Sequence, residues 1–169
     1  EARAIKNSDL INTSGYGYSR SIFYSNRSRI KSFNGFKYFT GISEAPYGML
    51  AECTNLVSIE FPDTLQRMSD SMLYATAITE LTIPEGVTKI DGLRSCSSLK
   101  KINILRAEAP TSTLSAFGSS EDSYTGRNTY NTGENILYVP TGATGYDTGV
   151  WLDPLQNAEK CGFTLSATL

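Results

Sequence analysis

The sequence predicts a β-solenoid, a stack of similar coils that forms one domain with short parallel strands and little helix. The first observation behind this prediction is a repeat: "LAECTNLVSIEF" (50–61) and "LRSCSSLKKINI" (93–104) both read Leu-x-x-Cys-x-x-Leu-x-x-Ile. A third copy, "AITELTIPEGVTKI" (77–90), lies between them, offset from its neighbours by 22 and 21 residues. A period in the low twenties indicates a solenoid, because each unit buries its apolar face only by stacking on its neighbours.

The second observation is the alternation of apolar and polar residues inside each copy. "VSIEF", "TELTI" and "KKINI" have the period of two that is typical of a short strand with one buried face. Pro62 and Pro84 follow two of these strands, a turn comes next, and "LQRM" or "VTKI" then reads as a second extended segment. The side chains expected to point into the core are Ile59, Phe61, Leu81, Ile83, Ile102 and Ile104.

An earlier and more degenerate coil precedes these copies. It is read in "FKYFTGISEAPYGML" (36–50), where Phe36, Phe39 and Ile42 are expected to take the apolar columns. No window of the sequence shows a sustained 3.6-residue period with helix caps. About four coils are therefore predicted, with helix scarce.

The paired cysteines read as packing residues. Cys53 and Cys96 occupy one column of the repeat, and Ala75 is expected to fill it in the coil between. Stacked strands lie about 4.8 Å apart, which puts the two cysteines roughly 10 Å apart, too far for the disulfide limit of about 7 Å. Further metal ligands at short spacing are missing, so both thiols are expected to be buried and free. Cys161, in "EKCGF", has no histidine or clear basic neighbour that would activate it.

Composition excludes several classes of function. The chain has 169 residues, a formal net charge of −2 and no histidine. The near-neutral charge gives no electrostatic footprint for nucleic acid or anionic lipid. Without histidine, Ser-His and Cys-His nucleophile pairs and His-ligated zinc are excluded, so we expect no enzyme, no cofactor and no metal site. No apolar run approaches the length of a transmembrane helix, so membrane insertion is not expected.

These columns resemble a known family, the BspA-like leucine-rich repeats. The carrying pattern is Leu-x-x-Cys-[Ser/Thr]-x-Leu-x-x-Ile-x-[Ile/Phe], followed by Pro-x-x-Val-x-x-Ile. "IKSFNGFKYFTGI" (30–42) resembles the family's opening coil, and "ILYVPTGATGYDTGVW" (136–151) its C-terminal closing segment. The resemblance covers about residues 30–155. It divides the domain into an irregular N-terminal segment (1–29), the repeat coils (30–107) and a C-terminal cap (108–169).

The resemblance implies a non-catalytic binding module. Members of the family are common on the surface of Bacteroides-type bacteria or secreted by them, and adhesion is the usual proposal for them. We therefore expect a secreted or cell-surface monomer that recognises a host protein or a glycan, although no export signal is visible in this chain. The alternative is a structural or phage-derived surface spacer that displays other domains and has no ligand of its own.

Two candidate binding regions follow from the pattern, and which of them carries binding stays open. Strand alternation turns a polar, mixed-charge row outward, and solenoids conventionally bind partners on a strand face. A long polar loop (118–135) is the second region, since tyrosine supplies contact area in binding loops. Ordinary solvated positions and a mobile insertion are the plain alternatives. The candidate residues are Ser58, Glu60, Glu80, Thr82, Lys101 and Asn103 on the strands, and Tyr124, Arg127 and Tyr130 in the loop.

The other motifs give weaker evidence for a function. Glu60 and Glu80 are expected near 5 Å apart, the spacing of retaining glycosidases, but a shallow wet face argues against catalysis. "NTSGYGYSRSIF" (12–23) stands where some relatives carry a calcium loop; it has no carboxylate, so no calcium is expected there. Its Gly-x-Gly lacks the third glycine of a dinucleotide site. "TGATGYDTG" (141–149) lacks the Lys-Ser/Thr ending of a phosphate loop and is read as turns that hold Tyr146 against Trp151.

Overall fold

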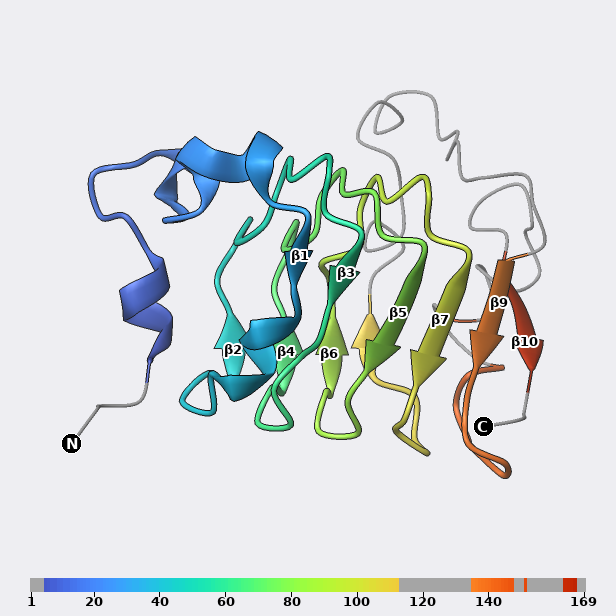
Figure 1. The fold of residues 1–169 in the computed structure, drawn as a ribbon. Coiled ribbons are helices and arrows are strands. Elements are labelled where there is room, and N and C mark those ends of the chain that lie inside the picture. Colours follow the sequence, from blue (N-terminus) through green and yellow to red (C-terminus); the bar gives the residue numbers. More distant parts are fainter. Residues whose placement is uncertain (1–4, 113–134, 148–150, 152–162, 167–169) are drawn as a thin grey trace.

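The computed structural model describes residues 5–112, 135–147, 151 and 163–166. Within them the chain forms a parallel β-solenoid of about four turns, which confirms the predicted fold class. The coils contribute strands of two to four residues to a front layer and strands of two residues to a back layer, and the two layers run in opposite directions in Figure 1. In the part of the chain that the structure describes, no helix is long and apolar enough to span a bilayer.

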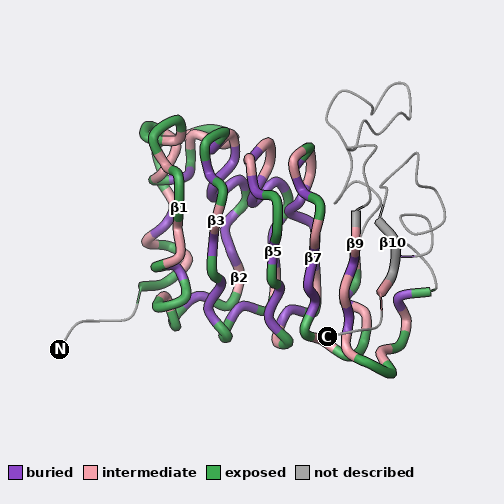
Figure 2. Tube along the Cα trace, turned by 45° about the vertical axis from the view of Figure 1, so that its right-hand side comes forward, coloured by how far each residue is buried: buried purple, intermediate pink, exposed green. Residues whose placement is uncertain are grey.

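The front layer holds the strands that the alternation predicted. Its strands pair in parallel, with β1 paired to β3 and a four-stranded sheet in the order β10-β9-β7-β5. β3 lies beside β5 in Figures 1 and 2. The strands are β1 (Ser32–Phe33), β3 (Ser58–Ile59), β5 (Glu80–Ile83), β7 (Lys101–Ile104), β9 (Asn135–Tyr138) and β10 (Phe163–Ser166).

The back layer is a second parallel sheet in the order β2-β4-β6-β8. Two of its strands lie in "LQRM" and "VTKI", so the predicted second extended segment of each coil is confirmed. Each strand has two residues. The strands are β2 (Glu44–Ala45), β4 (Arg67–Met68), β6 (Lys89–Ile90) and β8 (Thr111–Ser112).

The hydrophobic core fills the space between the two layers. Figure 2 shows buried residues running through every coil. Each residue predicted to face inward from the front strands is buried, and Met68 and Ile90 face them from the back layer. The predicted alternation is therefore confirmed at Ile59, Phe61, Leu81, Ile83, Ile102 and Ile104.

The N-terminal segment closes one end of this core with short 3-10 helices and aromatic packing. Phe33 lies 5.3 Å from Phe36 between ring centroids, and Phe36 lies 6.3 Å from Phe61. Phe36 and Ile42 are buried core residues, as predicted, whereas Phe39 is only partly buried, and the residue in register with Ile59 is Phe33. The extra aromatic residues blur the pattern here, since phenylalanine fits either column. The helices are η1 (Asn7–Leu10), η2 (Gly17–Arg20), η3 (Tyr24–Arg29) and η4 (Asn34–Tyr38).

The cysteine column runs along the upper edge, where the chain returns from the back layer to the front. Cys53 and Cys96 are buried and free, as predicted. The residue between them is Thr76 and not Ala75: its hydroxyl Oγ1 lies 3.6 Å from the Cys96 Sγ. Ala75 instead has a left-handed backbone (φ 56°), as do the residues just before each cysteine. Each cysteine precedes the next apolar residue of the repeat by three positions, whereas Thr76 precedes Ile78 by two. This coil is therefore one residue shorter directly after Thr76.

The C-terminal end is closed by aromatic residues, as the sequence predicted. Tyr146 and Trp151 pack edge to face with ring centroids 5.4 Å apart. The Trp151 indole donates a hydrogen bond to the Pro110 carbonyl at 2.7 Å, and the Tyr146 hydroxyl donates to the Arg106 carbonyl at 2.8 Å. Both polar groups of these buried rings are thereby satisfied.

Candidate functional site

The outward side of β3, β5 and β7 carries the polar row that the sequence predicted. Glu80 is in register with Lys101, and Thr82 with Asn103, so these side chains stand next to each other across neighbouring strands. Glu60, Glu80 and Thr82 are exposed, and Ser58 and Lys101 are partly exposed. Asn103 differs, because it is only 8% exposed and cannot offer the open contact that its position predicted.

Glu80 is the centre of the best-connected cluster on this face. Lys101 Nζ lies 2.8 Å from Glu80 Oε1, and Asn103 Nδ2 donates to the same oxygen at 3.1 Å. Hydrogen bonds from Lys101 and then Asn103 hold the pKa of Glu80 below its ordinary value, and the Glu80 carboxylate in turn raises the pKa of Lys101. The Lys101 ammonium also lies 5.2 Å from the centre of the Tyr138 ring on β9. Tyr138 was not among the predicted residues, because the chain between β7 and β9 is longer than the 21–22-residue period of the repeat.

Asn103 supports this cluster from below. Its amide also donates to Thr82 Oγ1 at 3.2 Å, while its own Oδ1 is buried without a hydrogen-bond partner in the described structure. A buried amide whose nitrogen donates hydrogen bonds holds the accepting side chains in position. Asn103 therefore orders Glu80 and Thr82 rather than contacting a partner directly.

Glu60 belongs to a separate pair at the N-terminal end of the face. Its Oε2 lies 2.6 Å from the Nζ of Lys37 in η4, and this carboxylate raises the pKa of Lys37. Glu60 and Glu80, predicted to lie one above the other, are each paired with a lysine of their own, one in the preceding coil and one in the following coil. The arrangement does not supply the two free carboxylates that a retaining glycosidase needs.

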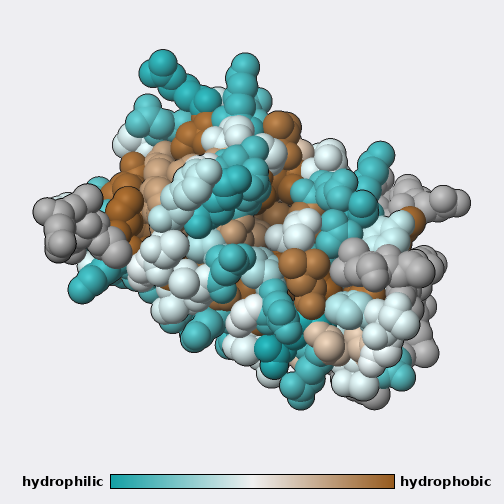
Figure 3. All heavy atoms as spheres, turned by 60° about the horizontal axis from the view of Figure 1, so that its bottom comes forward, coloured by the Kyte–Doolittle hydropathy of each residue, from teal (hydrophilic) through white to brown (hydrophobic). Residues whose placement is uncertain are grey.

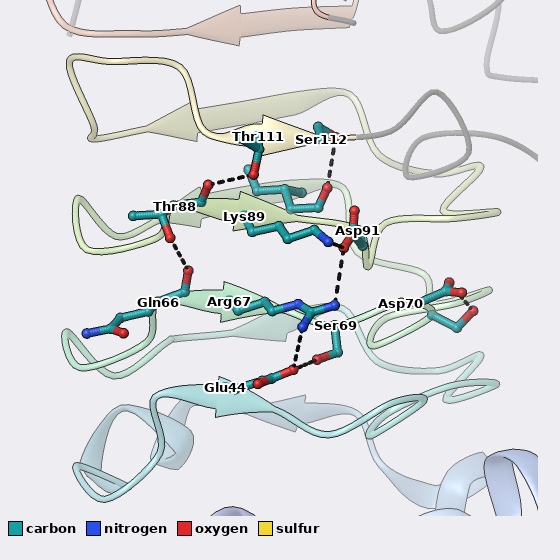
Figure 4. Close-up of polar contacts among 12 residues, drawn as sticks. Glu44, Gln66, Arg67, Ser69, Asp70, Thr88, Lys89, Asp91, Thr111 and Ser112 are labelled. Carbon is teal, nitrogen blue, oxygen red and sulfur yellow. Dashed lines mark hydrogen bonds and ion pairs between the residues drawn. The ribbon is translucent and has the colours of Figure 1, made fainter.

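The back layer carries a charged ladder that the sequence reading missed (Figure 4). Glu44 and Lys89 flank Arg67 in register across β2, β4 and β6. Arg67 Nη1 lies 3.1 Å from Glu44 Oε1 and its Nη2 3.7 Å from Asp91 Oδ2, which is also 3.0 Å from Lys89 Nζ. Ser69 donates to Glu44 Oε1 at 3.0 Å. The 22-residue offset between Arg67 and Lys89 was a signal that could have revealed this row.

Hydroxyl groups extend the back face beside this ladder. Thr88 donates to the Gln66 carbonyl at 3.2 Å, Thr111 to the Thr88 carbonyl at 3.1 Å, and Ser112 to the Ile90 carbonyl at 2.8 Å. Each bond joins one coil to the coil before it, as Figure 4 shows. These hydroxyls satisfy main-chain groups and therefore stabilise the stack.

Figure 3 shows the lower turn edge as mostly hydrophilic, with small hydrophobic areas between the polar side chains. Among the described residues, no group of three or more His, Cys, Asp or Glu side chains could hold a metal ion. The loop residues Tyr124, Arg127 and Tyr130, and also Cys161, lie outside the described residues.

The repeat matches one family of proteins along most of the chain. Residues 18–135 match the BspA type leucine rich repeat region in six copies. The chain belongs to this BspA-type family. No curated protein and no solved structure matches the chain significantly.

Membership of this family confirms the predicted resemblance and indicates the broad class of function. A leucine-rich-repeat solenoid of the BspA type indicates a repeat-protein binding module, and this fold is typically a non-catalytic scaffold. The family is generally associated with bacterial surface proteins.

Proposed function

We propose that this BspA-type domain is a non-catalytic, secreted or cell-surface module that recognises a protein or a glycan of a host through its front face. We define the front face as the outward side chains of β3, β5 and β7 together with Lys37. The observation that carries the proposal is the pair of exposed ion pairs, Lys37–Glu60 and Glu80–Lys101, at the two ends of this face.

Exposed ion pairs suit recognition because they are easily exchanged. A surface pair contributes only about 0–1 kcal/mol, so a partner can replace either member at little cost. Between 41% and 53% of each of these side chains is exposed. The back ladder is different, since the Asp91 side chain is only 10% exposed and separating it from its cations would leave a buried charge. The front face is therefore the better contact surface.

The mixed charge of the front face favours specificity over strong attraction. Two carboxylates flanked by two lysines select a partner with the opposite pattern of charges and repel one that is out of register. The parallel strands beneath them hold the side chains at the spacing of neighbouring strands, which lowers the entropy lost on binding. The family's general association with bacterial surface proteins supports the proposed location at the cell surface.

The test is binding of the purified domain to an array of host extracellular proteins and glycans. The variant Glu60→Lys/Glu80→Lys/Lys101→Glu reverses the front face. The matched control, Asp63→Lys/Glu85→Lys/Arg29→Glu, makes the same change in net charge at exposed positions outside the front strands. We expect a reproducible partner whose affinity falls about tenfold or more in the front-face variant and stays within about twofold in the control.

Two results would contradict the proposal. A folded domain that captures nothing on the array favours the spacer or phage-derived display alternative. A partner that is lost equally in both variants shows non-specific charge attraction instead of a front-face contact. Circular dichroism melts of each variant confirm that the fold is retained.

A further inference from the structure

We propose a second binding site on the upper edge, separate from the front face: a hollow beside Tyr47 that takes one acidic sugar ring, such as a hexuronic acid residue of a polysaccharide. The hollow is lined by Ile11, Arg20, Ser21, Pro46 and Tyr47. It lies where the N-terminal segment, through an antiparallel bridge between Ile11 and Ser21, meets the turn that follows β2.

Three stacked tyrosine rings make a rigid wall for this hollow. Tyr18 lies between Tyr47 and Tyr74, with centroid distances of 5.4 Å to each and interplanar angles of 22° and 27°. Gly48 permits this close approach, since a Cβ there would lie 2.5 Å from the Tyr18 ring, and its φ of 61° suits glycine. The hollow is thus preorganised by packing, and one face of Tyr47 is already covered by Tyr18.

The hydroxyl ends of these rings are fixed by polar neighbours. The Tyr18 hydroxyl donates to Ser71 Oγ at 3.2 Å, and Ser71 donates to Asp70 Oδ1 at 2.9 Å. Burial, then a hydrogen bond with Tyr18, raises the pKa of Tyr47 to about 12, so its hydroxyl is neutral at physiological pH. Tyr47 nevertheless remains 47% exposed, and this exposed part meets the hollow.

The size and chemistry of the hollow select the ligand class. Its volume is about 190 Å³, below the roughly 300–1,000 Å³ of pockets that enclose drug-sized ligands, which limits it to a single ring. An aromatic wall beside Pro46 and Ile11 suits the apolar face of a sugar ring. Arg20 is exposed and makes no ion pair among the described residues, so its guanidinium is available for a carboxylate. An apolar wall and one unpaired cation together fit an acidic sugar better than a neutral one.

The test compares methyl glucuronide with methyl glucoside by saturation-transfer NMR on the full chain. We expect weak binding of both, with the acid preferred about fivefold at low salt and less so at high salt. Arg20→Gln should abolish the preference for the acid while leaving the glucoside unchanged. Tyr47→Ala should weaken both ligands at least threefold, because the stacking wall is lost.

Matched controls separate this site from general effects. Tyr38→Ala and Arg29→Gln remove an exposed tyrosine and an exposed arginine elsewhere, and neither should change binding of either probe. The front-face triple variant should also bind both probes normally, so failure of the front-face proposal leaves this one standing. No saturation transfer to either probe, equal binding of acid and neutral sugars, or equal losses in the controls overturns the proposal. Arg20→Gln keeps the test valid if Tyr47→Ala does not fold, since the Arg20 side chain makes no described contact that stabilises the fold.

Discussion

Replacing Ile83 with aspartate tests the central feature of the fold, the inward row of the front strands. Ile83 lies at the end of β5, is fully buried, and stands in register with Ile104 of the next coil. The new carboxyl group would have to lie between the two layers, within the hydrophobic core to which Ile83 belongs. The chain can keep it there only by protonating it or by opening the coil.

The magnitude follows from two contributions. Loss of the buried isoleucine packing costs about 2–5 kcal/mol. Protonating the buried aspartate at pH 7 costs about 4 kcal/mol more, because the ordinary pKa of this side chain is about 3.9 and each pH unit corresponds to about 1.36 kcal/mol. The combined loss is comparable to the roughly 5–15 kcal/mol that stabilises a typical domain. We therefore expect Ile83→Asp to be unfolded or nearly so at 25 °C.

The assay is circular dichroism with urea and thermal unfolding, and Thr82→Asp is the matched control. Thr82 is the exposed neighbour on the same strand, so the same new charge should change the free energy of unfolding by less than about 1 kcal/mol. In a chain of this size, that corresponds to a shift in Tm of roughly 2–4 °C. A normal melt of Ile83→Asp together with an unfolded Thr82→Asp would show that the inner and outer faces have been assigned the wrong way round.

Two further predictions concern the thiol column and a crowded glycine. Burial raises the pKa of Cys96 to about 11, as it does for Cys53. The folded state therefore retains protons that the unfolded state releases, and the free energy of unfolding should be constant below about pH 9 and fall between about pH 9 and 11, by up to about 1.4 kcal/mol per pH unit for Cys96. Gly92→Ala should destabilise the domain by about 1–3 kcal/mol in urea unfolding, because its Cβ would lie 2.8 Å from the Ser69 carbonyl oxygen and 2.9 Å from the Met72 Cβ.

Each of these predictions has a control in the same chain. Cys96→Ala should reduce the alkaline slope by up to about 1.4 kcal/mol per pH unit and leave the contribution of Cys53. An unchanged pH slope in that variant would mean that the Cys96 thiol is not responsible for the decline. Gly35→Ala adds the same methyl group where no atom lies within 4 Å. If both glycine variants melt alike, the close contact at Gly92 does not constrain the coil.

The repeat itself could be predicted because it obeys a local rule. Alternation of apolar and polar residues fixes which side chains of a strand point inward, and every predicted inward residue from Ile59 to Ile104 is buried. The closing contact between Tyr146 and Trp151 was also readable, since turn residues separate the two rings by a short stretch of chain. Family membership followed from the same columns.

The errors arose where a column had to be carried across an irregular coil. The cysteine column was predicted at Ala75 instead of Thr76. A coil that is one residue shorter can be aligned with the shortening on either side of a small side chain, because the apolar pattern stays the same. Phe33 was missed since several phenylalanines compete for the same column. The pairing of Glu60 with Lys37 came from η4, whose path no periodicity describes.

The sequence by itself determined the architecture of this protein: the solenoid, its period, its inner and outer residues, and its family. These properties depend on contacts that recur at a fixed spacing, so one chain segment predicts the next. Only the tertiary structure decided which polar groups pair, that Asn103 is buried beneath Glu80, that the back layer carries the Arg67–Asp91 ladder, and that Tyr47 and Arg20 meet at one hollow. Those contacts join residues from different coils, and their distances depend on how side chains pack in three dimensions, which the repeat pattern leaves unspecified.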